Sequence, residues 1–122
     1  MSNTITLTLP LPPMTLSKNA RVHWGTRNAA FQKHKKIALY TLREQFSVVP
    51  FWPAAVMHLT WYQCAPLPDS DNALARVAAA RDAMEAGGLV SNDKYIAIGS
   101  INVVRVRTRK EQRVVLRFER RE

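Results

Sequence analysis

Two aspartates separated by one residue stand at the start of a predicted helix. Asp69 and Asp71 lie in the sequence Pro68-Asp69-Ser70-Asp71-Asn72, and residues i and i+2 of an extended segment point to the same side. Two carboxylates that close repel each other unless a cation or a shared proton lies between them. Hard divalent cations such as Mg²⁺ prefer oxygen ligands of this kind. The spacing favours a metal site, and helix N-capping alone is the alternative interpretation.

Two further aspartates follow in the same stretch of the chain. Asp93 is a third candidate ligand, although a residue in an ordinary polar turn is the alternative interpretation. A helix of about 15 residues leads away from its own start, so local geometry does not bring Asp93 to Asp71. Asp82 lies about 16 Å from Asp71 along a helix axis, too far to share a metal. We expect Asp82 to pair with a basic residue, such as Arg81 or one from another segment, or to support the site.

The charge balance points to a polyanionic partner. The chain of 122 residues carries 18 lysines and arginines against 9 acidic residues, a formal net charge of +9. A small domain this basic is typical of proteins that bind nucleic acid or an anionic membrane surface. No apolar run approaches the ~18 residues of a membrane span, and the N-terminus has no basic segment typical of a signal peptide. A single cysteine, Cys64, excludes a disulfide scaffold and fits a cytoplasmic location.

The pattern of apolar residues predicts one α+β domain over residues 1–122. Strands are expected over 4–9, 56–63 and 113–119 and within 95–107, where 101–107 is the clearest part, and helices over 28–46 and 72–86. The order β-α-β-α-β-β predicts a mixed four-stranded sheet with two packed helices. The last two strands are expected to form a hairpin.

Basic residues recur on several of these elements. Lysines cluster in the first helix, where a solvated helix face is the alternative interpretation, and Arg105 and Arg107 share one face of the third strand. Trp24 lies in a basic loop, where it could stack on unpaired bases or pack against the core. Contacts to phosphates position DNA without reading its sequence. The residues expected to contact DNA are Arg21, Trp24, Arg27, Lys33, Lys35, Lys36, Arg76, Arg105 and Arg107.

Three motifs occur along the chain in an order typical of a known family. The first strand is followed by Leu9-Pro10-Leu11-Pro12-Pro13 and then by Asn19. The second motif is Asp69-Ser70-Asp71-Asn72, and the third runs from Asp82-Ala83-Met84 to Asn92-Asp93. Together they span nearly the whole chain and resemble the RusA-like Holliday junction resolvases, which are common in phages and prophages.

The resemblance implies a homodimer that resolves four-way DNA junctions with Mg²⁺ or Mn²⁺ in recombination and repair. It implies that Asp69, Asp71 and Asp93 are metal-binding catalytic carboxylates. Asn19, Asn72 and Asp82 would support them. The reaction would be phosphodiester hydrolysis, in which the metal polarises a phosphoryl oxygen and activates a water.

One position departs from the family pattern. Ala78 stands where the family usually has a lysine, four residues before Asp82. Lys94, next to Asp93, is the candidate to replace it. Loss of a lysine that stabilises charge in the transition state could slow cleavage by orders of magnitude.

Three functions therefore remain open at the level of sequence. The first is a metal-dependent junction endonuclease, and the second is a junction-binding protein that has lost catalysis. The third is a basic module that binds a protein or RNA, with the aspartates serving only as caps and turns. We favour the first because all three matched aspartates are present.

Overall fold

A mixed β-sheet packed against helices forms the framework of the protein. The structure is a computed structural model that describes residues 3–18 and 20–122; Asn19, a predicted supporting residue, lies outside them. The strands are β1 (Thr4–Leu9), β2 (Ala54–Gln63), β3 (Ile96–Arg105) and β4 (Arg113–Arg121). The helices are α1 (Trp24–Gln45), α2 (Ser70–Arg76) and α3 (Ala78–Ala86). Short 3₁₀ turns are η1 (Met14–Leu16), η2 (Asp93–Tyr95) and η3 (Arg109–Glu111).

The sheet has the order β1-β4-β2-β3, with β4 antiparallel to both of its neighbours and β3 parallel to β2. The predicted α+β fold with a mixed four-stranded sheet is confirmed. The predicted hairpin of the last two strands is wrong, because β2 lies between β3 and β4. Since Val114, Leu116 and Phe118 are fully buried, β4 takes a central place between two strands.

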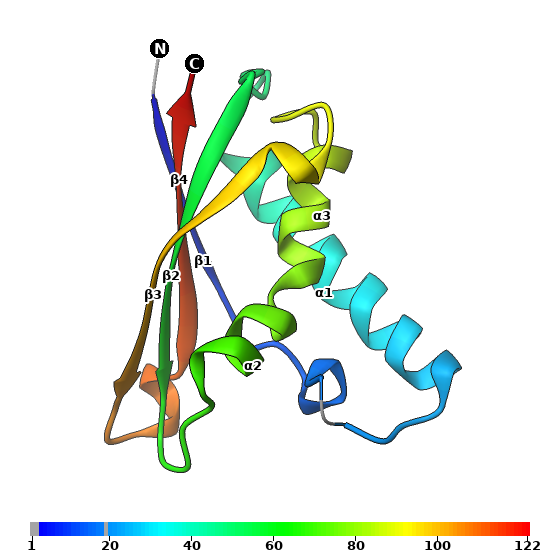
Figure 1. Cartoon of the computed structure of the whole chain (residues 1–122), viewed down its shortest axis with the longest axis vertical. Coiled ribbons are helices and arrows are strands. Elements are labelled where there is room, and N and C mark those ends of the chain that lie inside the picture. Colours follow the sequence, from blue (N-terminus) through cyan, green and yellow to red (C-terminus); the bar gives the residue numbers. More distant parts are fainter. Residues whose placement is uncertain (1–2, 19) are drawn as a thin grey trace.

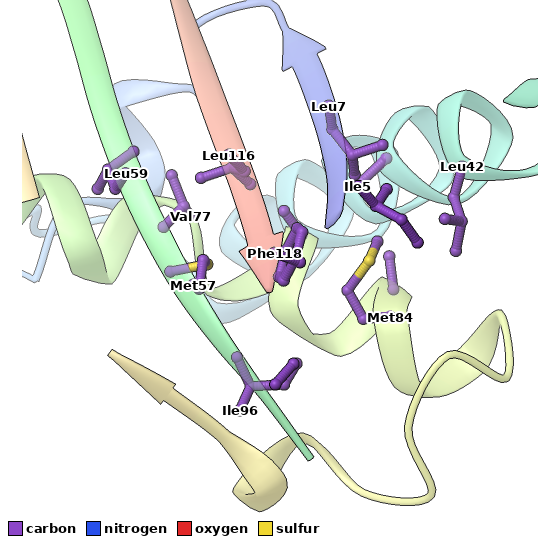
Figure 2. Close-up of a cluster of buried hydrophobic side chains, with 14 of the residues drawn as sticks. Ile5, Leu7, Leu42, Met57, Leu59, Val77, Met84, Ile96, Leu116 and Phe118 are labelled. Carbon is purple, nitrogen blue, oxygen red and sulfur yellow. The ribbon is translucent and has the colours of Figure 1, made fainter. Parts of the chain in front are cut away.

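The core lies between one face of the sheet and the helices α1 and α3 (Figure 1). Alternate residues of each strand point to this side, as the period of a strand requires. Figure 2 shows Leu116 and Phe118 of β4 between Met57 of β2 and Leu7 of β1. Met84 of α3 closes the same cluster from the helical layer. Trp52 and Trp61 are also buried in this core.

The second predicted helix is divided into α2 and α3. The break is at Val77, whose backbone has φ −99° and ψ 8°, in the sparsely populated region between the helical and extended basins. Val77 is fully buried, and so are Ala73 before it and Ala80 after it. The change of direction therefore lets both short helices bury one face against the core.

The first helix begins four residues before its predicted start. The His23 side chain caps it by accepting a hydrogen bond from the Gly25 backbone N–H at 3.0 Å. In the part of the chain that the structure describes, no helix combines the length and apolarity needed to cross a membrane.

Candidate nucleic-acid interface and acidic sites

The start of α2 holds two of the predicted metal ligands. Asp69 is the N-cap, and its Oδ1 accepts a hydrogen bond from the Asn72 backbone N–H at 2.7 Å. Asp71, in the first turn, has a side chain that is 81% exposed, and Lys18 Nζ lies 3.7 Å from its Oδ2. An exposed ion pair of this length contributes little to stability. The Asp71 carboxylate is therefore accessible to a cation from solvent.

Asn72 fixes the segment before α1 onto the start of α2. Its Oδ1 accepts hydrogen bonds from the Ser17 hydroxyl at 2.7 Å and from the Lys18 backbone N–H at 3.3 Å. This contact places Lys18 beside Asp71. The predicted role of Asn72 in supporting the metal site stays a prediction.

A second acidic group lies at the end of α3. Asp82, Glu85 and Asp93 each offer a carboxylate oxygen within 4.8 Å of the others. The Asp93 backbone N–H donates to Glu85 Oε1 at 2.9 Å, and Asp82 Oδ2 pairs with Lys35 Nζ of α1 at 2.9 Å. The three carboxylates could hold a divalent cation, although Lys35 already neutralises one of them. The expected pairing of Asp82 with a basic residue is confirmed.

Asp93 does not join Asp69 and Asp71 within one chain. Among residues 3–18 and 20–122, the group at the end of α3 is the one cluster of three metal-ligating side chains this close together. In Figure 1, α2 lies toward the end of the sheet where β3 connects to β4, whereas η2 lies toward the end that bears the chain termini. The chain reverses direction at Gly88, whose φ is +85°. Asp93 therefore lies beside the last turn of α3 and not beside the start of α2.

Lys94 belongs to the same end of the molecule as Asp93. Its backbone N–H donates to Asn92 Oδ1 at 2.9 Å, and its Nζ lies 5.2 Å from the centre of the Tyr95 ring. Ala78, at the family's lysine position, is exposed at the first residue of α3. Lys94 therefore accompanies the second acidic group and does not replace a lysine beside Asp71.

Sequence reasoning missed Glu85 as a possible ligand. Glu85 lies three residues after Asp82 in α3, so the two carboxylates share one helix face. That spacing was available in the sequence. The proximity of Asp93 was not, because it depends on the turn after α3.

The structure corrects the predicted role of Arg76. Its side chain is buried at 4% exposure, so it is not part of the exposed basic surface. One guanidinium nitrogen donates to the Pro12 carbonyl, and the guanidinium carbon lies 4.6 Å from the centre of the Trp61 ring. Burial lowers the pKa of Arg76 below its usual value. Arg76 lies three residues after Ala73, on the face of α2 that is buried against the core.

Two more of the predicted DNA contacts are engaged within the protein. Arg27 donates to the carbonyls of Ser17 and Ala20 at 3.2 and 2.9 Å, which holds the loop before α1. Lys35 is committed to Asp82. The remaining basic residues of the set are exposed: Arg21, Lys33, Lys36, Arg105 and Arg107.

Trp24 is the first residue of α1 and is 76% exposed. The interpretation that it packs the loop onto the core is therefore wrong. An exposed indole beside basic residues can stack on an unpaired base. Trp24 stays a candidate contact on this geometry.

An open groove of about 570 Å³ lies where β2 and β3 end, lined by Cys64, Ala65, Arg105, Val106 and Arg107. The chain that forms its Cys64–Ala65 wall continues directly into Pro68 and the N-cap Asp69. Two guanidinium groups in an open groove suit a phosphate backbone. Residues 66–68 thus connect the groove wall to the Asp69–Asp71 turn along the chain.

Comparisons with known protein families and with curated proteins give no match for this chain.

Proposed function

We propose that this protein is a metal-dependent endonuclease that cleaves four-way DNA junctions as a homodimer in the cytoplasm. The observation that supports it best is the pairing of exposed carboxylates with an arginine-lined groove. Asp69 and Asp71 lie on the segment that continues from the groove of Arg105 and Arg107. Acidic ligands beside a cationic channel are what phosphodiester hydrolysis on DNA requires.

The donors at the start of α2 fit a hard cation. Asp71 is exposed, with one distant cationic partner, and Asp69 lies two residues away in the cap. Mg²⁺ is commonly held by one or two carboxylates with waters completing its shell. A bound Mg²⁺ or Mn²⁺ would supply Lewis-acid activation of the phosphate and of a water. Arg105 and Arg107 would bind the flanking backbone and orient the scissile bond.

In a homodimer, the third aspartate of the site could come from the second copy of the chain. A four-way junction presents pairs of equivalent strands, which a two-fold symmetric protein matches. Asp93 of the same chain lies with Asp82 and Glu85. The three-aspartate site implied by the family resemblance would therefore require Asp93 from a second copy of the chain. Without it, the metal at α2 would have a smaller set of ligands.

The test is a cleavage assay on a labelled four-way junction and a linear duplex, with Mg²⁺, Mn²⁺ or EDTA. We expect metal-dependent nicks in the junction and none in the duplex. Asp71→Asn should lose cleavage, whereas Glu85→Gln should retain it if the metal binds at α2. Loss with Glu85→Gln alone would move the metal to the end of α3. A junction left intact with both metals would contradict the proposed activity.

The second candidate is a protein of the same fold that binds branched DNA without cutting it. Two observations favour it: Asp93 is separated from Asp69 and Asp71, and the exposed Ala78 brings no cation to the site. This protein would shift the junction in a gel equally well with and without metal. Its binding would be unchanged in Asp71→Asn.

A further inference from the structure

Arg76 is a buried cation without a counter-ion. Among the described residues no carboxylate forms an ion pair with it. Its guanidinium donates to the Pro12 carbonyl and lies over the Trp61 ring, and its buried Nε has no hydrogen-bond partner among the described residues. Burying a charge is unfavourable unless an opposite charge or a full set of hydrogen bonds compensates it. The buried charge of Arg76 is thus not fully compensated, and a bound anion would compensate it.

A pocket of about 190 Å³ is lined in part by Arg76. Its walls are Met14, Gln63, the 66–68 segment, Asn72 and Arg76. The volume has room for several waters, or for a small ion with some of them. No carboxylate is among the described residues that line it, so these walls carry no full negative charge.

Asn72 gives the pocket a second donor. The Lys18 backbone N–H can only donate, so the side-chain atom that it contacts must be the oxygen Oδ1. Oδ1 also accepts from the Ser17 hydroxyl, which leaves the Asn72 amino group as the donor on this side chain. The amide of Gln63 is already used, by the Trp61 indole N–H and by the Pro66 carbonyl.

We propose that this pocket binds one phosphate oxyanion, with the Arg76 guanidinium and the Asn72 amino group as donors. A guanidinium and a neutral amide are donors well suited to phosphate oxygens. The phosphate can come from free inorganic phosphate or from a nucleic-acid backbone. The second source rests on the proposed function, because the pocket wall at Pro68 leads into Asp69.

The first test measures thermal stability in EDTA without DNA, replacing chloride by inorganic phosphate at constant ionic strength. A ligand that binds only the folded state raises the Tm with its concentration. We expect a rise of about 2 °C or more for the wild type. Asn72→Asp should abolish it, since an aspartate keeps the oxygen that accepts from Ser17 and Lys18 but replaces the amino donor by a negative charge.

Two arginine variants complete this test. Arg76→Gln should also lose the phosphate effect. Arg81→Gln is the matched control, because Arg81 likewise donates to a backbone carbonyl, that of Ile96, and has a buried Nε without a partner, but does not line the pocket. Arg81→Gln should keep the full rise. An equal rise in the wild type and in Asn72→Asp, or no rise in the wild type, would overturn the proposal.

A second arm identifies the source of the phosphate. The slope of log K against log salt for DNA binding falls by about one when one phosphate contact is lost. A smaller slope for Asn72→Asp than for Arg81→Gln supports a backbone phosphate in the pocket. Equal slopes together with the phosphate effect on Tm support free phosphate. Because the first test needs neither metal nor DNA, its outcome is independent of whether the protein cleaves junctions.

Discussion

The side-chain oxygen of Asn72 accepts a hydrogen bond from the Ser17 hydroxyl at 2.7 Å, although the two residues are 55 positions apart. This contact joins the segment after β1 to the first turn of α2. It brings Lys18 to Asp71, and it fixes the orientation of the Asn72 amide toward the Arg76 pocket. Residues from two distant motifs are thus held in one place by a single side chain.

Asp69 and Asp71 should respond differently when stability is measured. Asp69→Ala removes the N-cap of α2 and should lower the free energy of unfolding by about 1 kcal/mol, whereas Asp69→Asn keeps a capping oxygen and should cost less. Asp71→Asn loses only an exposed ion pair and should change stability by less than about 0.5 kcal/mol. Urea unfolding of the three variants measures this. A large loss in Asp71→Asn would mean that its carboxylate has a structural partner.

His34 should make stability depend on pH. Its side chain is buried beside Arg76, and its pKa is lowered from 6.5, chiefly by burial, with a backbone hydrogen bond to Pro10 opposing and Arg76 adding to the decrease. The unfolded chain therefore binds more protons than the folded one as the pH falls below 6.5, and the protein loses stability there. Above 6.5 this contribution is constant.

Unfolding midpoints measured from about pH 5 to about pH 8, on both sides of the ordinary histidine pKa of about 6.5, test this pH dependence. The wild type should lose stability on the acid side, and His34→Leu should show a flatter profile. The exposed His23 provides a control, since His23→Asn keeps a capping acceptor for the Gly25 N–H. If His34→Leu loses as much stability below pH 6.5 as the wild type, other groups cause the pH dependence.

Trp24 should report DNA binding by fluorescence. It is exposed, whereas Trp52 and Trp61 are buried at 1% and 0% exposure. Acrylamide should therefore quench one component of the emission, and Trp24→Phe should remove that component. If Trp24 stacks on a base, adding the junction should quench the same component and protect it from acrylamide. Unchanged Trp24 emission in a saturated complex would exclude stacking.

Much of the architecture followed from residue patterns. Alternating apolar residues located β1, β2 and β4 to within a few residues, because each strand buries one face in the same core. The residue patterns did not predict how β3 and β4 pair. The connection at 106–112 is too long to fix a register as a two-residue turn does, so burial of Leu116 and Phe118 decided the place of β4.

The candidate site could be predicted only in part. The N-cap at Asp69 is a local feature and was readable from the sequence. The burial of Arg76 depends on which face of α2 packs on the core, and the grouping of Asp93 with Asp82 and Glu85 depends on the reversal at Gly88. Both are consequences of tertiary packing, which helical spacing alone does not contain.

The most direct test of the account measures binding to a four-way junction and to a linear duplex of the same composition, in EDTA at one fixed salt concentration. The endonuclease and the non-cleaving binding protein both require recognition of branched structure. We predict a dissociation constant at least about tenfold lower for the junction, which corresponds to about 1.4 kcal/mol. Equal affinity for the two DNAs would contradict the account, since the basic surface would then bind any phosphate backbone alike.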